Sequence, residues 1–79
     1  MIDPIEIRRY TRSSYIVTLH ETGDAIQRRY TVTCAVHDGV KYQEKRIGAK
    51  YGYTQRGRAV KVYDAEVAQI DRMLTKQGR

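Results

Sequence analysis

Positive charge is concentrated in residues 41–63, and the side chains found there are of the types that bind phosphates. The segment reads KYQEKRIGAKYGYTQRGRAVKVY and contains seven Lys or Arg residues against a single acid, Glu44. The rest of the chain has eight basic and eight acidic residues, so the segment accounts for the whole net charge of +6. Clustered cations attract phosphates, and exposed aromatic rings can stack on unpaired bases. The segment therefore predicts contact with a nucleic acid.

The candidate binding residues share a long cationic or an aromatic side chain. Tyr51 and Tyr53 lie between glycines and are the better candidates for base stacking, which would favour single-stranded DNA or RNA. Tyr42 and Tyr63 are predicted to lie in the core, because the chain has no Phe or Trp. The full set of candidates is Arg29, Lys41, Lys45, Arg46, Lys50, Tyr51, Tyr53, Arg56, Arg58 and Lys61.

Residues suited to catalysis or metal binding do not form a recognisable pattern. Cys34 is the single cysteine, so an internal disulfide and a CxxC metal motif are excluded. His20 and His37 fall at strand or turn ends, away from a nucleophile or a ligand cluster. The glycine-rich stretch GAKYGYTQRG lacks the GK[ST] ending of a phosphate-binding loop. We therefore expect a protein that is not an enzyme and that has no cofactor and no metal site.

Size and hydropathy limit the architecture and the location. Seventy-nine residues are enough for one domain. The longest apolar runs are far shorter than the roughly 18 residues of a membrane span, and the first ten residues lack the apolar core of a signal peptide. The chain begins with Met, so we expect a complete small gene product. We expect it to be located in the cytoplasm, or in the cytoplasm of a host cell if it is phage-encoded, and to have no membrane partner. The sequence is compatible with a homo-oligomer.

Alternating apolar and polar residues predict two adjacent strands. One covers residues 15–20 and the other residues 26–36, with a turn over residues 21–24. We expect Leu19 to pair with Ile26, and Tyr15 to pair with Tyr30, since this register keeps apolar groups on one face. The exception on that face is Arg28, which is expected near an edge or pointing outward.

The second predicted turn, over residues 37–39, is compatible with two registers. A two-residue Asp-Gly turn would place Val36 opposite Lys41. A three-residue loop with Gly39 in the left-handed conformation would place Val36 opposite Val40. The longer loop keeps the apolar residues together and is preferred. The other face of the resulting meander is then polar and free of acids, with His20, Thr18, Arg29, Gln27, Thr31, Thr33, Lys41, Gln43 and Lys45.

The remaining segments complete an α+β prediction. Residues 1–12 form an edge strand or arm, 13–47 a three-stranded meander, 48–58 a basic Gly/Tyr loop and 59–63 a fourth strand. A helix is predicted over 64–77, with Asp64 as its N-cap and an apolar stripe packed on one sheet face. The expected fold is a three- to four-stranded antiparallel sheet with one C-terminal helix.

This layout is similar to small sheet-plus-helix modules that press a sheet face into the DNA major groove, such as the arm-binding domains of phage integrases. The similarity is one of architecture, without a shared motif. It implies duplex DNA as the partner if the sheet is the contact surface. The alternative is a phage- or plasmid-encoded inhibitor of a host protein, for example a CRISPR effector or polymerase. Such an inhibitor would bind an acidic surface through the same cations or through an edge strand.

Overall fold

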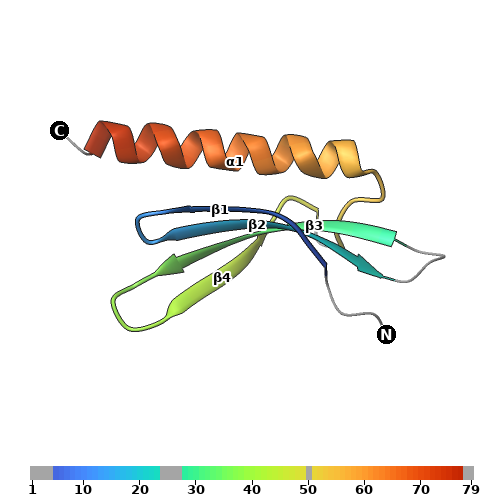
Figure 1. Cartoon of the computed structure of the whole chain (residues 1–79), viewed down its shortest axis with the longest axis horizontal. Helices are drawn as coiled ribbons and strands as arrows, with labels where there is room; N and C mark the ends of the chain where they lie inside the picture. Colours follow the sequence, from blue (N-terminus) through green and yellow to red (C-terminus); the bar gives the residue numbers. More distant parts are fainter. Residues whose placement is uncertain (1–4, 24–27, 50, 78–79) are drawn as a thin grey trace.

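The computed structural model describes residues 5–23, 28–49 and 51–77, which form an antiparallel sheet and one helix. The four strands lie in the order β1-β2-β3-β4. Helix α1 packs across one face, mainly over β2 and β3, as a second layer (Figure 1). The predicted α+β fold is confirmed. The elements are β1 (Ile5–Arg12), β2 (Tyr15–Gly23), β3 (Arg28–His37), β4 (Tyr42–Ile47) and α1 (Arg56–Gln77).

The core lies between α1 and the two central strands. Val17, Leu19 and Val32 are completely buried, and Ala59 and Ile70 of α1 lie against the same cluster. Removing the apolar surface of these side chains from water supplies the main driving force for packing the helix on the sheet. The predicted burial of Val32 is confirmed, as is that of Cys34 and Tyr63. Tyr42 is half exposed, so its predicted place in the core is wrong.

The predicted pairing of β2 with β3 is wrong by six residues. Leu19 pairs with Val32 instead of Ile26, which lies outside the described residues, and Tyr15 pairs with Val36. Strand β2 continues through Glu21–Gly23, where a turn was predicted. An even shift keeps every side chain on its expected face, because the side-chain period of a strand is two. Alternation alone therefore could not distinguish the two registers. Arg28 lies at an exposed strand end, as expected.

The predicted pairing of β3 with β4 is wrong by three residues, and an odd shift exchanges the faces of β4. The loop has four residues, because Asp38 accepts hydrogen bonds from the N–H groups of Val40 and Lys41 and from Nε2 of Gln43. Val36 therefore pairs with Gln43. Gly39 has the predicted left-handed backbone, with φ of 100°. The rejected two-residue turn would have given the correct faces.

The exchange of faces changes the composition of the sheet surface that α1 does not cover, which we call the open face. Lys45 and Gln43 lie on the helix side with Cys34, whereas Glu44 and Arg46 lie on the open face. The expectation of an acid-free polar face is therefore wrong. Two further residues of this face, Thr18 and Thr31, are only 7% exposed, so they are not displayed as expected.

The helix begins eight residues earlier than predicted and replaces the predicted fourth strand. Residues 59–63 and Asp64 all lie inside α1, so the strand and the N-cap are both wrong. Ala59, Tyr63, Val67 and Ile70 recur at helical spacing and bring their side chains to the sheet. The alternation in residues 60–63 resembled a strand, but burying this stripe favours helix. Arg56 and Arg58 consequently belong to the helix and not to the loop.

The N-terminal segment predicted as an edge strand or arm over residues 1–12 is an edge strand in its described part. Strand β1 runs from Ile5 to Arg12 and pairs antiparallel with β2, with one irregularity between Glu6 and Arg8. Its side chains reach both faces of the sheet. Within the part of the chain that the structure describes, no helix is long and apolar enough to cross a membrane.

Candidate nucleic-acid interface

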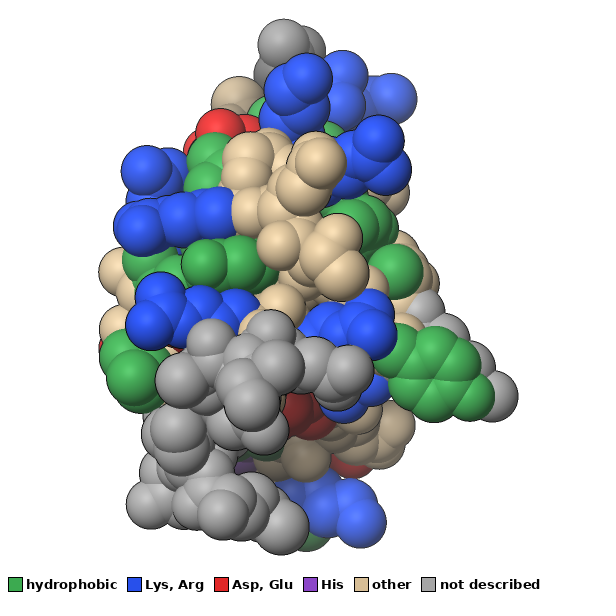
Figure 2. All heavy atoms as spheres, turned by 90° about the vertical axis from the view of Figure 1, so that its right-hand side faces the viewer, with side chains coloured by type: hydrophobic (Ala, Val, Ile, Leu, Met, Phe, Trp, Pro, Cys, Tyr) green, Lys and Arg blue, Asp and Glu red, His purple; other side chains and the backbone are tan. Residues whose placement is uncertain are grey.

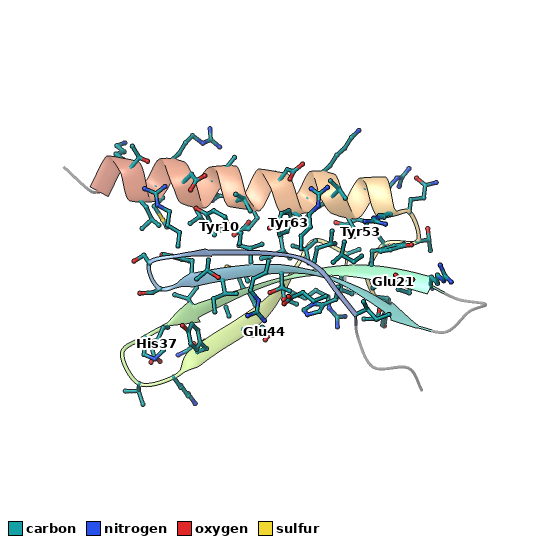
Figure 3. The ribbon with its side chains drawn as sticks, viewed as in Figure 1. Tyr10, Glu21, His37, Glu44, Tyr53 and Tyr63 are labelled. Atoms are coloured by element: carbon teal, nitrogen blue, oxygen red, sulfur yellow. The ribbon has the colours of Figure 1, made fainter. Side chains whose placement is uncertain are left out.

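The connection from β4 to α1 is built around Tyr53. Its backbone N–H and C=O exchange hydrogen bonds of 2.7 and 2.8 Å with Tyr30, which extends the sheet beside β3. Its hydroxyl accepts a hydrogen bond from the Ala49 N–H at 3.1 Å, and its ring lies where Gly48 has no side chain. Figure 3 shows Tyr53 between helix and sheet. The ring is therefore engaged in packing, which leaves the 72% exposed Tyr51 as the better placed tyrosine for stacking.

The start of α1 carries two arginines and no acid. Arg56 and Arg58 lie in its first turn and are exposed, and the turn contains no acid. The N-terminus of a helix is the positive end of its dipole, so the two guanidinium groups add to a potential that already attracts anions. A cation here opposes the dipole and does not favour helix formation. The position of these residues is thus better suited to binding an anion than to stabilising the fold.

The other candidate residues are distributed over the sheet. Arg29 lies on the open face near the start of β3, and Arg46 lies on the same face of β4. Lys45 points to the helix side, and Lys41 lies in the β3–β4 loop far from the start of α1 (Figure 1). Lys50 lies outside the described residues. The structure therefore does not bring the predicted set together on one sheet face.

Five of the seven acidic residues that the structure describes make contacts within the fold. Glu6 pairs with Arg9 at 2.8 Å and Glu21 pairs with Arg28 at 3.4 Å. The pKa of Asp38 lies below its usual range, because the Lys41 and Val40 N–H groups, and then Gln43, donate hydrogen bonds to its carboxylate. The two acids on the side of α1 that faces β1 also have cationic partners.

These last two acids and their partners form what we call the β1 flank. Asp64 lies 3.9 Å from Arg8, and Asp71 lies 2.8 Å from Nη1 of Arg12. The Tyr10 hydroxyl also donates a hydrogen bond to Asp71. That hydrogen bond, followed by the Arg12 guanidinium, lowers the pKa of the Asp71 carboxyl, and the carboxylate raises the pKa of Tyr10. The β1 flank ties the edge strand to the helix (Figure 3).

The side of α1 that faces away from the sheet carries a row of cations with no acid among them. Four exposed residues follow one another at helical spacing and form the outer row: Arg58, Lys61, Arg72 and Lys76. Ala65 and Ala68 continue the same line between the two pairs of cations. Within the described chain, no residue of the outer row makes an ion pair. The sequence-based set lacked Arg72 and Lys76, although both lie inside the predicted helix 64–77 and away from its apolar stripe.

The end of the molecule where α1 begins is visibly basic. Figure 2 views this end and shows Lys and Arg side chains gathered around a neutral centre, with few acids between them. Strand β3 also starts at this end. Arg56 and Arg58 of α1 and the first residues of β3, Arg28 and Arg29, thus lie at the same end of the molecule.

The described residues offer little for covalent or metal chemistry. Burial, followed by the nearby Glu66 charge, raises the pKa of the Cys34 thiol, so the thiol remains protonated and is a poor nucleophile. No group of three His, Cys, Asp or Glu residues is placed to hold a metal ion in the described part of the chain.

Comparison with protein-family models, with curated proteins and with solved structures finds no match for this chain.

Proposed function

We propose that this chain is a small, non-enzymatic nucleic-acid-binding protein that contacts phosphate groups through cations at the start and along the outer side of α1. The observation that carries the proposal is the separation of charges. Four acids pair with arginines of β1 and of β3, whereas the cations of the outer row make no ion pair with a described residue. Cations that stabilise a fold lie beside acids or, like Lys76, at the C-terminal end of a helix. Arg58 and Lys61 do neither within the described chain.

A phosphate backbone is the partner that this arrangement suits. Contacts between Lys or Arg and phosphates release condensed counterions, which gives affinity without base recognition. Arg56 and Arg58 lie in the helix turn whose dipole also favours an anion. These residues supply donors and charge but no catalytic group, so binding alone is proposed.

The test is a salt titration of binding to a short duplex and to its single strand, with Arg56→Gln/Arg58→Gln as the variant. The wild-type chain should bind at low salt, with affinity falling linearly on a log–log scale. The variant should lose up to about 0.9 of slope per contact on duplex and about 0.7 on single strand. Arg8→Gln/Arg9→Gln is the matched control, because it removes the same charge from arginines that already pair with acids. Absence of wild-type binding to both forms at low salt contradicts the proposal.

A protein-binding inhibitor is the second candidate, and the exposed edge of β4 favours it. Strand β4 ends the sheet order, and no other described strand pairs with its outer edge. An extended segment of another protein could add to such an edge. Glu44, Lys45 and Arg46 in the same strand are charged, however, and charged edge strands are typical of proteins that avoid edge pairing. This candidate becomes the better one if the salt titration shows no binding.

A further inference from the structure

We propose that the outer row of α1 lies in the major groove of duplex DNA, so that the helix and not the sheet faces the partner. This inference rests on the proposed function and specifies both its contact surface and its form of nucleic acid. It reverses the orientation expected from the sheet-plus-helix layout, in which a sheet face enters the groove.

The charges on the open face and on the outer side of α1 indicate which surface faces the nucleic acid. On the open face, Glu6 and Glu44 lie among Arg9, Arg29 and Arg46, and Glu6 pairs directly with Arg9. On the outer side of α1, the outer row has four cations and no acid. A polyanion is attracted to the surface with the larger unbalanced charge, which is the helix.

The spacing of the outer row suits a groove lined by phosphates on both sides. With a rise of about 1.5 Å per residue, Lys61 and Arg72 lie roughly 16 Å apart along the helix. A helix with its side chains is about 10–12 Å wide, and the major groove is about 12 Å wide. The two pairs of cations can thus reach opposite phosphate strands while the middle of the helix lies over the groove.

The middle of the outer side has the small side chains that close approach requires. Ala65 and Ala68 are both exposed, and they occupy the line between Lys61 and Arg72. Long side chains at these positions would hold the helix away from the base edges. The acids nearest to this line, Asp64 and Asp71, lie on the side of α1 that faces β1 and are paired with arginines there.

Single-stranded nucleic acid fits the same surface less well. Binding of unpaired bases depends on exposed aromatic rings in a basic groove. The outer side of α1 has no aromatic residue, and Tyr53 is packed against Gly48 and Tyr30. Duplex should therefore bind more tightly than the single strand of the same sequence.

The main test is the variant Lys61→Gln/Arg72→Gln/Lys76→Gln with labelled duplex. Its affinity at moderate salt should fall by up to roughly tenfold per lost contact, and the salt slope by up to about 0.9 per contact. The control, Arg8→Gln/Arg9→Gln/Arg28→Gln, removes the same net charge from arginines that pair with acids, and its effect should be much smaller. Circular dichroism verifies that both variants retain the helix.

A second pair of variants tests close approach. Ala68→Glu places one acid in the middle of the outer side, and Thr11→Glu places one on an exposed position of β1. Ala68→Glu should weaken duplex binding far more than Thr11→Glu. Wild-type protein should also protect guanine N7, an atom of the major groove, from methylation.

The outcomes separate the two proposals. If the wild type binds duplex but the triple variant and its control bind it with equal affinity, the placement of the outer row in the groove is wrong. The proposed function would still stand in that case. Unchanged methylation of guanine N7 under saturating protein overturns the major-groove contact. Absence of binding to any nucleic acid overturns both proposals, as does tighter binding of anionic lipid vesicles than of duplex.

Discussion

Two sides of the same helix use charge in opposite ways. On the β1 flank, Asp64 and Asp71 meet arginines of β1, and Asp71 also accepts a hydrogen bond from Tyr10. On the outer row, the cations face away from the sheet and no acid lies among them. The β1 flank joins two elements that share few backbone contacts, whereas the outer row joins nothing within the described chain.

The difference separates charges that serve the fold from charges that are free for a ligand. Exposed ion pairs contribute little individually, but a hydrogen-bonded group such as Tyr10–Asp71 also fixes geometry. Cations without acids repel one another, and within the outer row Lys76, in the last turn of α1, is the residue that the helix dipole favours. Stability measurements should therefore respond to the β1 flank, and binding measurements to the outer row.

Both regions depend on the core beneath the helix, and the largest effect on stability is expected there. Val32→Ala removes part of a completely buried side chain and should cost about 1–3 kcal/mol in the free energy of unfolding. Thr33→Ala, on the neighbouring position facing the other way, should cost clearly less. Chemical denaturation measures both. A large loss for Thr33→Ala with none for Val32→Ala would contradict the observed faces of β3.

The next largest effect is expected where the chain turns toward α1. Gly48 has φ of 86°, and an added Cβ would overlap the Tyr53 hydroxyl. Gly48→Ala should therefore lower stability by more than about 1 kcal/mol. Gly39→Ala is the control, since Gly39 has φ of 100° but open space around it. If thermal melts show equal losses for the two variants, the contact with Tyr53 does not position the start of α1.

Sequence patterns were sufficient for the architecture but not for the placement of charge. Alternation in residues 15–20 and 26–36 indicates half-buried strands, and the stripe from Val67 to Leu74 indicates a packed helix; both are confirmed. The helix start was missed because residues 60–63 alternate like a strand. These residues are helical because the helix packs against β2 and β3, and this tertiary effect is not visible in the local alternation.

The face of β4 was missed for a reason local to one turn. Asp38 accepts three hydrogen bonds in a four-residue loop, and this changes the register by an odd number of residues. The change moves Lys45 to the helix side and Glu44 to the open face. Of the candidate interface, the cationic segment was predictable from composition, whereas placing Arg58 and Lys61 in one row with Arg72 and Lys76 required the correct start of the helix.

The contact between Tyr10 and Asp71 on the β1 flank should make the stability of the fold depend on pH. The pKa of Asp71 is lowered, so its contribution is present above the unfolded value of about 4 and is lost as pH falls through the folded pKa. The pKa of Tyr10 is raised, so its contribution is present below about pH 10 and is lost as pH rises further. Tyr10→Phe should thus be destabilising between these limits. The melting temperatures of the wild type and of Tyr10→Phe are compared across pH, with Tyr42→Phe as the control. A difference between Tyr10→Phe and the wild type that stays constant at all pH values would contradict this role.

The smallest effect on stability is expected on the outer row. Arg72→Gln/Lys76→Gln changes two exposed side chains that make no ion pair with a described residue. The free energy of unfolding should fall by less than about 1 kcal/mol, which is the upper limit for losing a cation at the exposed C-terminal end of a helix. Denaturation of this variant beside Arg8→Gln/Arg12→Gln compares the two sides of α1 directly. A larger loss for the outer-row variant would show that its cations serve the fold.

The most direct test of the difference between the two sides is a two-dimensional ¹⁵N–¹H NMR titration of the chain with a short duplex. The largest amide shifts should follow the outer side of α1, from Arg58 through Ala65 and Ala68 to Lys76, with small shifts on the β1 flank. Largest shifts on the open face, at Thr33 and Arg46, with little change along α1, would contradict the assignment of the outer row to the ligand.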